Sequence, residues 1–307
     1  MLKVANCHCD LLSYLEQSST HTPYDLRCRT AIPQWEQGGV VLETLVTFVR
    51  TSPGCSKSGL RQFEIFKTLK LPSTLRAVLA VENGSCFLDE EEALDLAFTR
   101  LEAWAPLLYI SLTWNDANRF GGGNATDIGL KTDGQEILKW MSGKKIAIDL
   151  SHTSDRLAYD ILNFIDAKKL DITPIASHSN FRSICPHERN LPDELALEIG
   201  RRHGLIGLNF VRKFLGSKGA TNDLVAHVEH AAALNLFDHF CFGADFFDDS
   251  LATPGLEHLK PFFYPGYDDA SCYPKVINLL QPLLTPEQLE KIAYSNLSNF
   301  VNNASSI

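Results

Sequence analysis

The segment IAIDLSHTSDRLAYDILNFIDAKKLDITPIASHSN, residues 146–180, contains the pattern that decides the fold. Two short apolar runs, Ile146–Leu150 and Pro174–Ala176, are each followed at once by a serine and a histidine. Short apolar runs without strict alternation are typical of parallel strands that are covered on both faces. The segment therefore predicts two parallel strands whose carboxyl ends carry His152 and His178.

Comparable apolar runs recur along the whole chain. They predict six further strands, over residues 2–5, 40–48, 77–81, 107–112, 205–210 and 240–243. Helical segments fall between them, with starts expected at Asp89–Glu92, Pro192–Glu194 and Thr285–Pro286. Eight strand–helix units in 307 residues predict an α/β fold, a (β/α)8 TIM barrel that forms one catalytic domain over residues 1–307. An open, doubly wound sheet is the alternative.

Composition narrows the class of protein. Lys plus Arg is 28 and Asp plus Glu is 37, so the formal net charge is −9, which argues against a nucleic-acid binder. No apolar run approaches the roughly 18 residues of a membrane-spanning helix. The first seven residues lack the pattern of a signal peptide. We therefore expect a cytoplasmic protein whose eight cysteines are free thiols.

Polar, chemically active residues follow most of the predicted strands. In a barrel the carboxyl ends of the strands share one rim, and catalytic groups gather there. Neutral imidazole and carboxylate oxygen are both ligands for Zn²⁺. The polar groups at the strand ends are His8-Cys9-Asp10, Glu82-Asn83-Gly84, Thr113-Trp114-Asn115-Asp116, Asp149-Leu150-Ser151-His152, Ser177-His178-Ser179-Asn180 and Gly243-Ala244-Asp245.

Five residues are candidate metal ligands, which is more than one tetrahedral zinc ion can use. Two ions could use all of them if one carboxylate bridged the pair, and Glu82 is the natural bridge because its strand lies between those of the other ligands. Two such ions can share a water, lower its pKa and hold the attacked carbonyl. Asp245, on the eighth strand beside the first, is placed to take and return a proton. The five candidate ligands are His8, Asp10, Glu82, His152 and His178.

The alternation of side chains along a strand separates the first motif into two faces. His8 and Asp10 should point to the same side and hold one ion. Cys7 and Cys9 should then point toward the helices, as small buried hydrophobic residues rather than zinc ligands.

These motifs, in order, resemble those of the renal (membrane) dipeptidase family of binuclear zinc peptidases. The resemblance runs from the first strand to Asn296-Leu297 and is most specific from His178 to Arg189-Asn190-Leu191-Pro192-Asp193. It implies a TIM barrel of the metal-dependent hydrolase type, with two Zn²⁺ per chain.

The resemblance also implies a role for each site residue. His8 and Asp10 would bind one zinc ion, His152 and His178 the other, and Glu82 would bridge them. Asp245 matches the proton-transfer aspartate of the family. Substrate would be bound by Arg189, whose guanidinium fork suits a terminal carboxylate, together with Trp114 and Asn115.

Some positions depart from the family pattern. The best-known members carry a histidine where this chain has Trp114, and a tryptophan can only donate a hydrogen bond through its indole N–H. Asn6 stands where an aspartate is common, and Asn83 follows Glu82 in place of a glycine. The secreted, lipid-anchored members have an export signal and an anchor tail, which we do not find here. These differences leave the choice of substrate open.

The region Phe246–Tyr273 follows the eighth strand and is rich in Phe, Tyr, Asp and Pro. It should lie over the barrel mouth, either as a lid that excludes water or as a packed loop without function.

The expected activity is hydrolysis of short peptides by a hydroxide that bridges two zinc ions, with a D-residue at the C-terminal position as one option. An N-acyl amino acid deacylase on the same site is an alternative, and so is an inactive barrel that acts as a binding protein. Intact candidate ligands and an intact Asp245 argue against the inactive barrel. The expected partner is a small peptide substrate, with no nucleic acid and no membrane, and a homodimer is left open.

Overall fold

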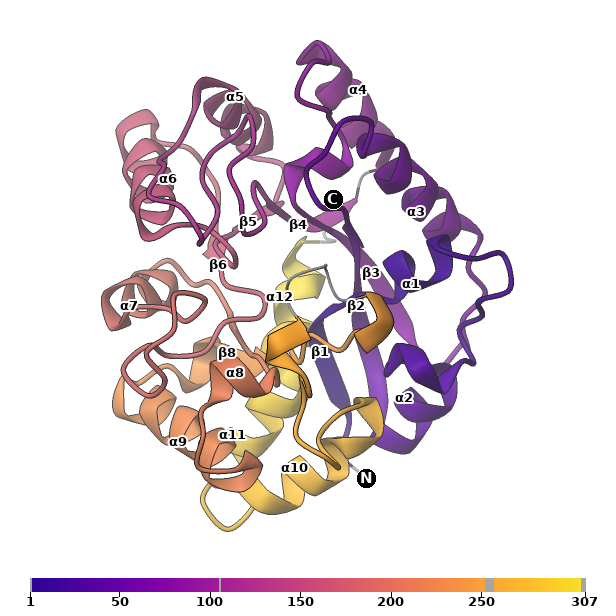
Figure 1. The fold of residues 1–307 in the computed structure, drawn as a ribbon. Helices are drawn as coiled ribbons and strands as arrows, with labels where there is room; N and C mark the ends of the chain where they lie inside the picture. The colour runs from indigo at the N-terminus through magenta and orange to yellow at the C-terminus, as the bar shows by residue number, and fades with distance from the viewer. Residues whose placement is uncertain (1, 105, 252–256, 305–307) are drawn as a thin grey trace.

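The computed structural model describes residues 2–104, 106–251 and 257–304. Within these ranges, eight parallel strands form one sheet in the order β6-β5-β4-β3-β2-β1-β8-β7 (Figure 1). The strands are β1 (Val4–Cys9), β2 (Val40–Phe48), β3 (Arg76–Glu82), β4 (Leu107–Ser111), β5 (Ala147–Asp149), β6 (Pro174–Ile175), β7 (Ile206–Leu208) and β8 (Phe240–Phe242).

The two ends of this sheet meet. A parallel bridge joins Ala176, just after β6, to Ile206 in β7. The amide of Ala176 donates to the carbonyl of Leu205 at 2.8 Å, and the amide of Gly207 donates to the carbonyl of Ala176 at 2.8 Å. The sheet therefore closes into a barrel, which confirms the predicted (β/α)8 fold and excludes the open, doubly wound sheet.

Helices surround the barrel and form its outer layer (Figure 1). None of those in the described ranges is long and apolar enough to cross a membrane. They are α1 (Leu11–Glu16), α2 (Ile32–Gly38), α3 (Ser56–Thr68), α4 (Asp95–Trp104), α5 (Thr132–Met141), α6 (Asp155–Lys168), α7 (Asp193–Arg201), α8 (Arg212–Leu215), α9 (Ala220–Ala233), α10 (Tyr273–Leu280), α11 (Pro286–Glu290) and α12 (Asn296–Ala304).

Two of the three predicted helix starts are confirmed. Helix α7 begins at Asp193, directly after Pro192, and α11 begins at Pro286 with Thr285 as its N-cap. The acidic stretch Asp89–Glu92 was wrongly expected to begin a helix, because α4 begins only at Asp95. The side chain of Glu92 instead accepts from the Asp89 amide at 2.9 Å and closes a turn ahead of the helix.

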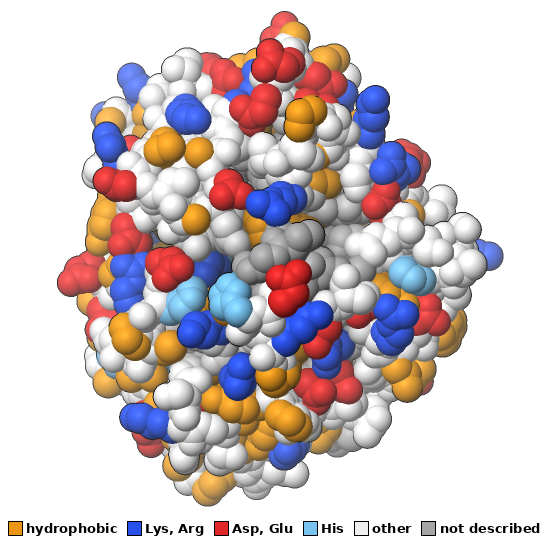
Figure 2. Space-filling model, viewed as in Figure 1, with side chains coloured by type: hydrophobic (Ala, Val, Ile, Leu, Met, Phe, Trp, Pro, Cys, Tyr) orange, Lys and Arg blue, Asp and Glu red, His pale blue; other side chains and the backbone are white. Residues whose placement is uncertain are grey.

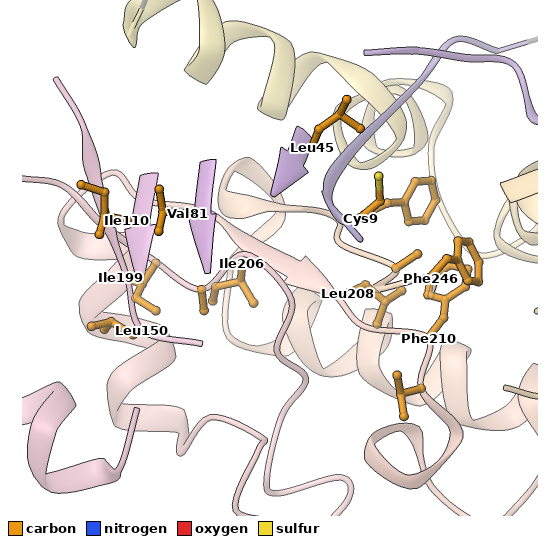
Figure 3. Close-up of a cluster of buried hydrophobic side chains, with 14 of the residues drawn as sticks. Cys9, Leu45, Val81, Ile110, Leu150, Ile199, Ile206, Leu208, Phe210 and Phe246 are labelled. Atoms are coloured by element: carbon orange, nitrogen blue, oxygen red, sulfur yellow. The ribbon is translucent and has the colours of Figure 1, made fainter. Parts of the chain in front are cut away.

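Apolar side chains fill both sides of the barrel wall. On the outer side, apolar residues of the strands, among them Val81, Ile110 and Leu150, belong to the same buried cluster as Ile199 of α7 (Figure 3). On the inner side, Leu297 and Val301 of α12 join the buried interior cluster and close the end of the barrel where the strands begin. The opposite end, where the strands finish, is left for polar groups.

The first strand is longer than predicted and contains an irregularity. It runs from Val4 to Cys9, so His8 lies inside the strand rather than after it. Its register with β2 shifts between Asn6 and Cys9, where three steps along β1 match two steps along β2. Such a bulge turns neighbouring side chains to the same face. Cys9 packs toward the helices as predicted. Cys7 is buried among apolar residues as predicted, but it lies in the interior cluster, so its predicted direction toward the helices was wrong.

Candidate metal centre and active site

Glu82, at the end of β3, lies at the centre of the buried polar groups. Its Oε2 is 3.2 Å from Nε2 of His8. Its Oε1 is 2.9 Å from Nε2 of His152 and 3.8 Å from Nε2 of His178. The two carboxylate oxygens therefore face different histidines, which come from β1 on one side and from the segments after β5 and β6 on the other.

Two aspartates complete the side of the cluster that contains His8. Nε2 of His8 is 4.0 Å from Oδ2 of Asp10 and 3.8 Å from Oδ1 of Asp245. The other oxygen of Asp245 accepts a hydrogen bond from Nδ2 of Asn209 at 2.9 Å. The backbone of Asp245 has φ 62°, a left-handed conformation that is uncommon for a residue other than glycine and is concentrated at functional sites.

Hydrogen bonds fix which nitrogen of His8 carries its proton. Nδ1 of His8 lies 2.8 Å from the Tyr109 hydroxyl, and this hydroxyl donates to the Cys7 carbonyl at 3.0 Å. The Tyr109 oxygen therefore accepts from Nδ1–H of His8. The lone pair of Nε2 is left facing Glu82.

The other two histidines are fixed in the same way. The Ser177 hydroxyl donates to Asp149 at 2.6 Å, so its oxygen accepts from Nδ1–H of His178 at 2.7 Å. Oδ1 of Asn115 accepts from Nδ1–H of His152 at 2.8 Å. Histidines that bind metals through one nitrogen usually donate the other N–H to an oxygen in this manner.

This donor set fits divalent metal ions. Nε2 of His8 and Nε2 of His178 are buried and have no hydrogen-bond partner in the part of the chain that the structure describes. A cation placed between these neutral imidazole lone pairs and the buried carboxylate would satisfy both. His8, Glu82 and His178 form one group of donors that could hold an ion, and His8, Asp10 and Asp245 form another.

Burial shifts the pKa values of the site away from those in water. It raises the pKa of Glu82 to about 8, against the opposing effect of the Arg189 charge. It raises the pKa of Asp245 to about 7, against the opposing effect of His8. Burial also holds the pKa values of His152 and His178 well below the usual range. These histidines are therefore neutral near pH 7, as metal ligands must be.

A cavity of about 390 Å³ lies over the cluster and contains Arg189. The Arg189 side chain is buried, with its guanidinium carbon 5.3 Å from the centre of the Phe214 ring. Its Nε has no partner among the described residues, and Nη2 makes only a long contact, 3.5 Å, with the His178 carbonyl. A buried guanidinium with unused donors in a cavity is suited to a carboxylate.

The two residues predicted after β4 also line the cavity. The Trp114 ring lies 5.3 Å from that of Phe48 and 5.9 Å from that of His152. Asn115 uses its oxygen to hold His152, so one of its functions is to position that histidine.

The region Phe246–Tyr273 borders the cavity, as expected for a segment over the barrel mouth. Phe247, His258, Leu259 and Phe262 line the cavity, while residues 252–256 lie outside the described ranges. Acidic and basic side chains are interspersed on this face of the molecule (Figure 2).

Two residues of the site were missed by sequence reasoning. Tyr109 lies in the middle of β4, where the sequence predicts only a buried strand position. Asn209 lay inside the predicted strand of residues 205–210, although an asparagine within such a run was a usable signal. The structure shows that β7 ends at Leu208, so Asn209 belongs to the catalytic rim.

Comparisons with known proteins agree with this geometry. The family model described as "Membrane dipeptidase (Peptidase family M19)" matches residues 67–306, which include Glu82, His152, His178, Arg189 and Asp245. His8 and Asp10 lie before the matched segment.

Two curated relatives are similar over parts of the chain. An uncharacterised protein of Acinetobacter calcoaceticus is 34% identical over 157 residues, 48% of this chain and 46% of the relative. Dipeptidase tcpJ of Claviceps purpurea is 29% identical over 174 residues, 55% of this chain and 37% of the relative. The matched segments thus span less than half the length of either relative.

A solved structure is similar over nearly the whole chain. The metallopeptidase from Rhodobacter sphaeroides, liganded with a phosphinate mimic of the dipeptide L-Ala-D-Ala, superposes with a TM-score of 0.81. It is 17% identical, with 99% of each chain covered, so it supports the barrel fold. Since the family model matches more than half of the chain, this protein belongs to the membrane dipeptidase family, peptidase family M19.

Proposed function

We propose that this protein is a metal-dependent dipeptidase that hydrolyses short peptides with a free carboxyl end, using two zinc ions. The observation that carries the proposal is the position of Glu82. Its two oxygens face His8 on one side and His152 and His178 on the other. The alternatives of an N-acyl amino acid deacylase and an inactive binding protein remain outcomes of the test below.

The proposed ligands divide into two sets around the shared carboxylate. His8 and Asp10 would hold one ion and His152 and His178 the other, with Glu82 between them. Nitrogen and oxygen donors of this kind suit Zn²⁺. When bound, two such ions lower the pKa of a shared water and polarise the attacked carbonyl.

Arg189 would bind the terminal carboxylate of the peptide. Its guanidinium lines the cavity and has donors that no described protein group uses. A charge-assisted, two-pronged hydrogen bond there would fix the peptide with its scissile bond toward Glu82.

Asp245 would move the proton. Its Oδ2 is held by Asn209, which leaves Oδ1 on the side of the cluster where His8 lies, 3.8 Å from Nε2. Hydrolysis needs a group that takes a proton from water and returns it to the leaving amine.

The comparisons support the substrate class. The family is that of the membrane dipeptidases, and the Rhodobacter sphaeroides protein binds a mimic of L-Ala-D-Ala. We therefore include peptides with a D-residue at the C-terminal position among the proposed substrates.

We further propose a cytoplasmic location. The eight cysteines are all free thiols, as is usual in reducing compartments.

A substrate panel tests the proposed function. The protein, reconstituted with zinc, is assayed on L-L and L-D dipeptides, on their C-terminal amides and on N-acetyl amino acids. We expect turnover of the free dipeptides, poor turnover of the amides, and loss of activity after chelation. Preferred cleavage of N-acetyl amino acids would indicate the deacylase. No turnover of any substrate, with metal bound, would indicate a binding protein.

A further inference from the structure

We propose that the site selects peptides whose C-terminal residue has a large apolar side chain. The proposal rests on the proposed function, because it takes Arg189 as the group that binds the terminal carboxylate. It goes further because it assigns the surroundings of Arg189 as the binding site for the side chain of the peptide's C-terminal residue.

The cavity wall beside Arg189 begins with helix α8 and the residue before it. Val211 and Phe214 both line the cavity, and the Phe214 ring lies 5.3 Å from the guanidinium carbon of Arg189. The His187 ring also lines the cavity and lies 4.8 Å from the Phe214 ring. Arg189 is thus set into an aromatic surface.

The segment after β8 continues the same wall. Phe247, Leu259 and Phe262 line the cavity, and the rings of Phe247 and Phe262 are 5.0 Å apart. The amide of Arg212 donates to the carbonyl of Phe262 at 2.7 Å, which joins this segment to the start of α8. The two groups of apolar residues therefore form one continuous surface, which we call the apolar wall: Val211, Phe214, Phe247, Leu259 and Phe262.

Covalent geometry places the substrate side chain against this wall. In the C-terminal residue of a peptide, the Cβ and the carboxyl carbon are bonded to the same Cα, so they are only about 2.5 Å apart. A carboxylate held by Arg189 therefore brings its own side chain to the apolar wall. Glu188, the charged residue next to Arg189 in the sequence, also lines the cavity, but its side chain is 62% exposed and its carboxylate lies 3.5 Å from Nδ1 of His187.

Size and polarity then decide which side chains fit. A large apolar side chain would leave water and contact the wall, whereas a charged one would lose part of its hydration against the same apolar residues. A side chain as large as Leu or Phe should improve kcat/KM by roughly 10- to 100-fold over glycine.

A C-terminal series on the parent enzyme gives the first test. The values of kcat/KM are compared for Ala-Gly, Ala-Ala, Ala-Leu, Ala-Phe, Ala-Asp and Ala-Lys, in both C-terminal configurations. We expect Leu and Phe to be preferred and Asp and Lys to be poorest. Turnover without such a preference, or a preference for Gly, Asp or Lys, would overturn the proposal while leaving the dipeptidase intact. No turnover of any peptide would overturn the proposed function, and this proposal with it.

A pair of matched variants gives the second test. Phe247→Ala removes part of the apolar wall, and Phe48→Ala makes the same change beside Trp114, which lines the same cavity but is not part of the apolar wall. We expect Phe247→Ala to lower the ratio of kcat/KM for Ala-Phe over Ala-Gly by about 5- to 10-fold, and Phe247→Leu to restore most of it. Phe48→Ala should leave this ratio unchanged. Since a general folding defect lowers both rates together, an unchanged ratio in Phe247→Ala would contradict the proposal.

Discussion

Three residues of this site act mainly by fixing which nitrogen of a neighbouring histidine carries the proton. Tyr109, Ser177 and Asn115 each present an oxygen to Nδ1 of one histidine. The result is that all three Nε2 lone pairs converge on one carboxylate. The sequence indicated the histidines, because they follow apolar runs, and Ser177 directly precedes His178. It did not indicate Tyr109 and Asn115 as partners of His8 and His152, because each is far from its histidine in the sequence and meets it only in the closed barrel.

The hydroxyl of Tyr109 offers a direct test of this arrangement. Tyr109→Phe keeps the buried ring but removes the acceptor for Nδ1–H of His8. We expect zinc affinity to fall by about 10- to 100-fold, the usual effect of losing such a partner. The measurement is competition with a chelating dye, with circular dichroism to show that the barrel is intact. Unchanged affinity would mean that the Tyr109 hydroxyl does not control His8.

Proton transfer and metal binding can be separated at the two aspartates near His8. Asp245→Asn retains the shape but cannot take a proton, so we expect it to keep two ions while its turnover falls by about 10²–10⁴-fold. Asp10→Asn should instead lose an ion as its primary defect. Metal content and turnover are measured side by side on both variants. If Asp245→Asn loses zinc, Asp245 is a ligand and the roles must be redrawn.

Among the elements, the backbones of β6, β7 and β8 are packed closely where glycines replace side chains. A Cβ at Gly207 in β7 would overlap the Ser177 carbonyl oxygen and approach Cα of Gly243, which follows β8. These two glycines therefore allow the backbone that carries His178 to lie against the neighbouring strands.

Gly207→Ala should push Ser177 away from its neighbours and displace His178. We expect a loss of about 1–3 kcal/mol in the free energy of unfolding, the usual cost of overpacking, together with weaker zinc binding. Urea denaturation of the metal-free protein measures the first effect and a zinc titration the second. Parent-like stability and zinc affinity in the variant would show that the close packing at this point is unimportant.

The bulge in β1 shows why the elements were only partly predictable. Seven strands were found close to their predicted positions, because most of the residues in each run are apolar. In β1 the sequence Asn6-Cys7-His8-Cys9 looks like the polar end of a strand, and strict alternation places Cys7 outside. Only pairing with β2 reveals the extra residue that turns both Cys7 and His8 inward. Register of this kind depends on the neighbouring strand and cannot be deduced from one strand alone.

For the molecule as a whole, a buried carboxyl outside the metal site should shape the dependence of stability on pH. Glu43 is fully buried in β2, where Oε1 accepts from Nδ2 of Asn6 at 2.7 Å. Asn6 also donates to the His8 carbonyl and accepts from the Ala244 amide, so this pair ties β1 to β2 and β8. Burial raises the pKa of Glu43 to about 8.

Because this pKa is higher in the folded than in the unfolded chain, the folded protein keeps a proton that the unfolded chain loses. The contribution of Glu43 to the free energy of unfolding is complete below the pKa of the unfolded chain, about 4.3. It is lost as the pH rises through the pKa of the folded protein, about 8. We expect the free energy of unfolding to fall between pH 5 and pH 9 more steeply in the parent than in Glu43→Gln. Urea denaturation across this range, with metal removed from both proteins, measures the difference. Equal slopes would show that Glu43 does not titrate differently on folding.

The central claim is that Glu82 lies between two metal ions. Anomalous X-ray scattering at the zinc absorption edge, from crystals grown with zinc, tests it most directly. We predict two peaks, one among His8, Asp10 and Oε2 of Glu82, and the other among His152, His178 and Oε1 of Glu82. A single peak, or two peaks of which neither touches Glu82, would contradict the account.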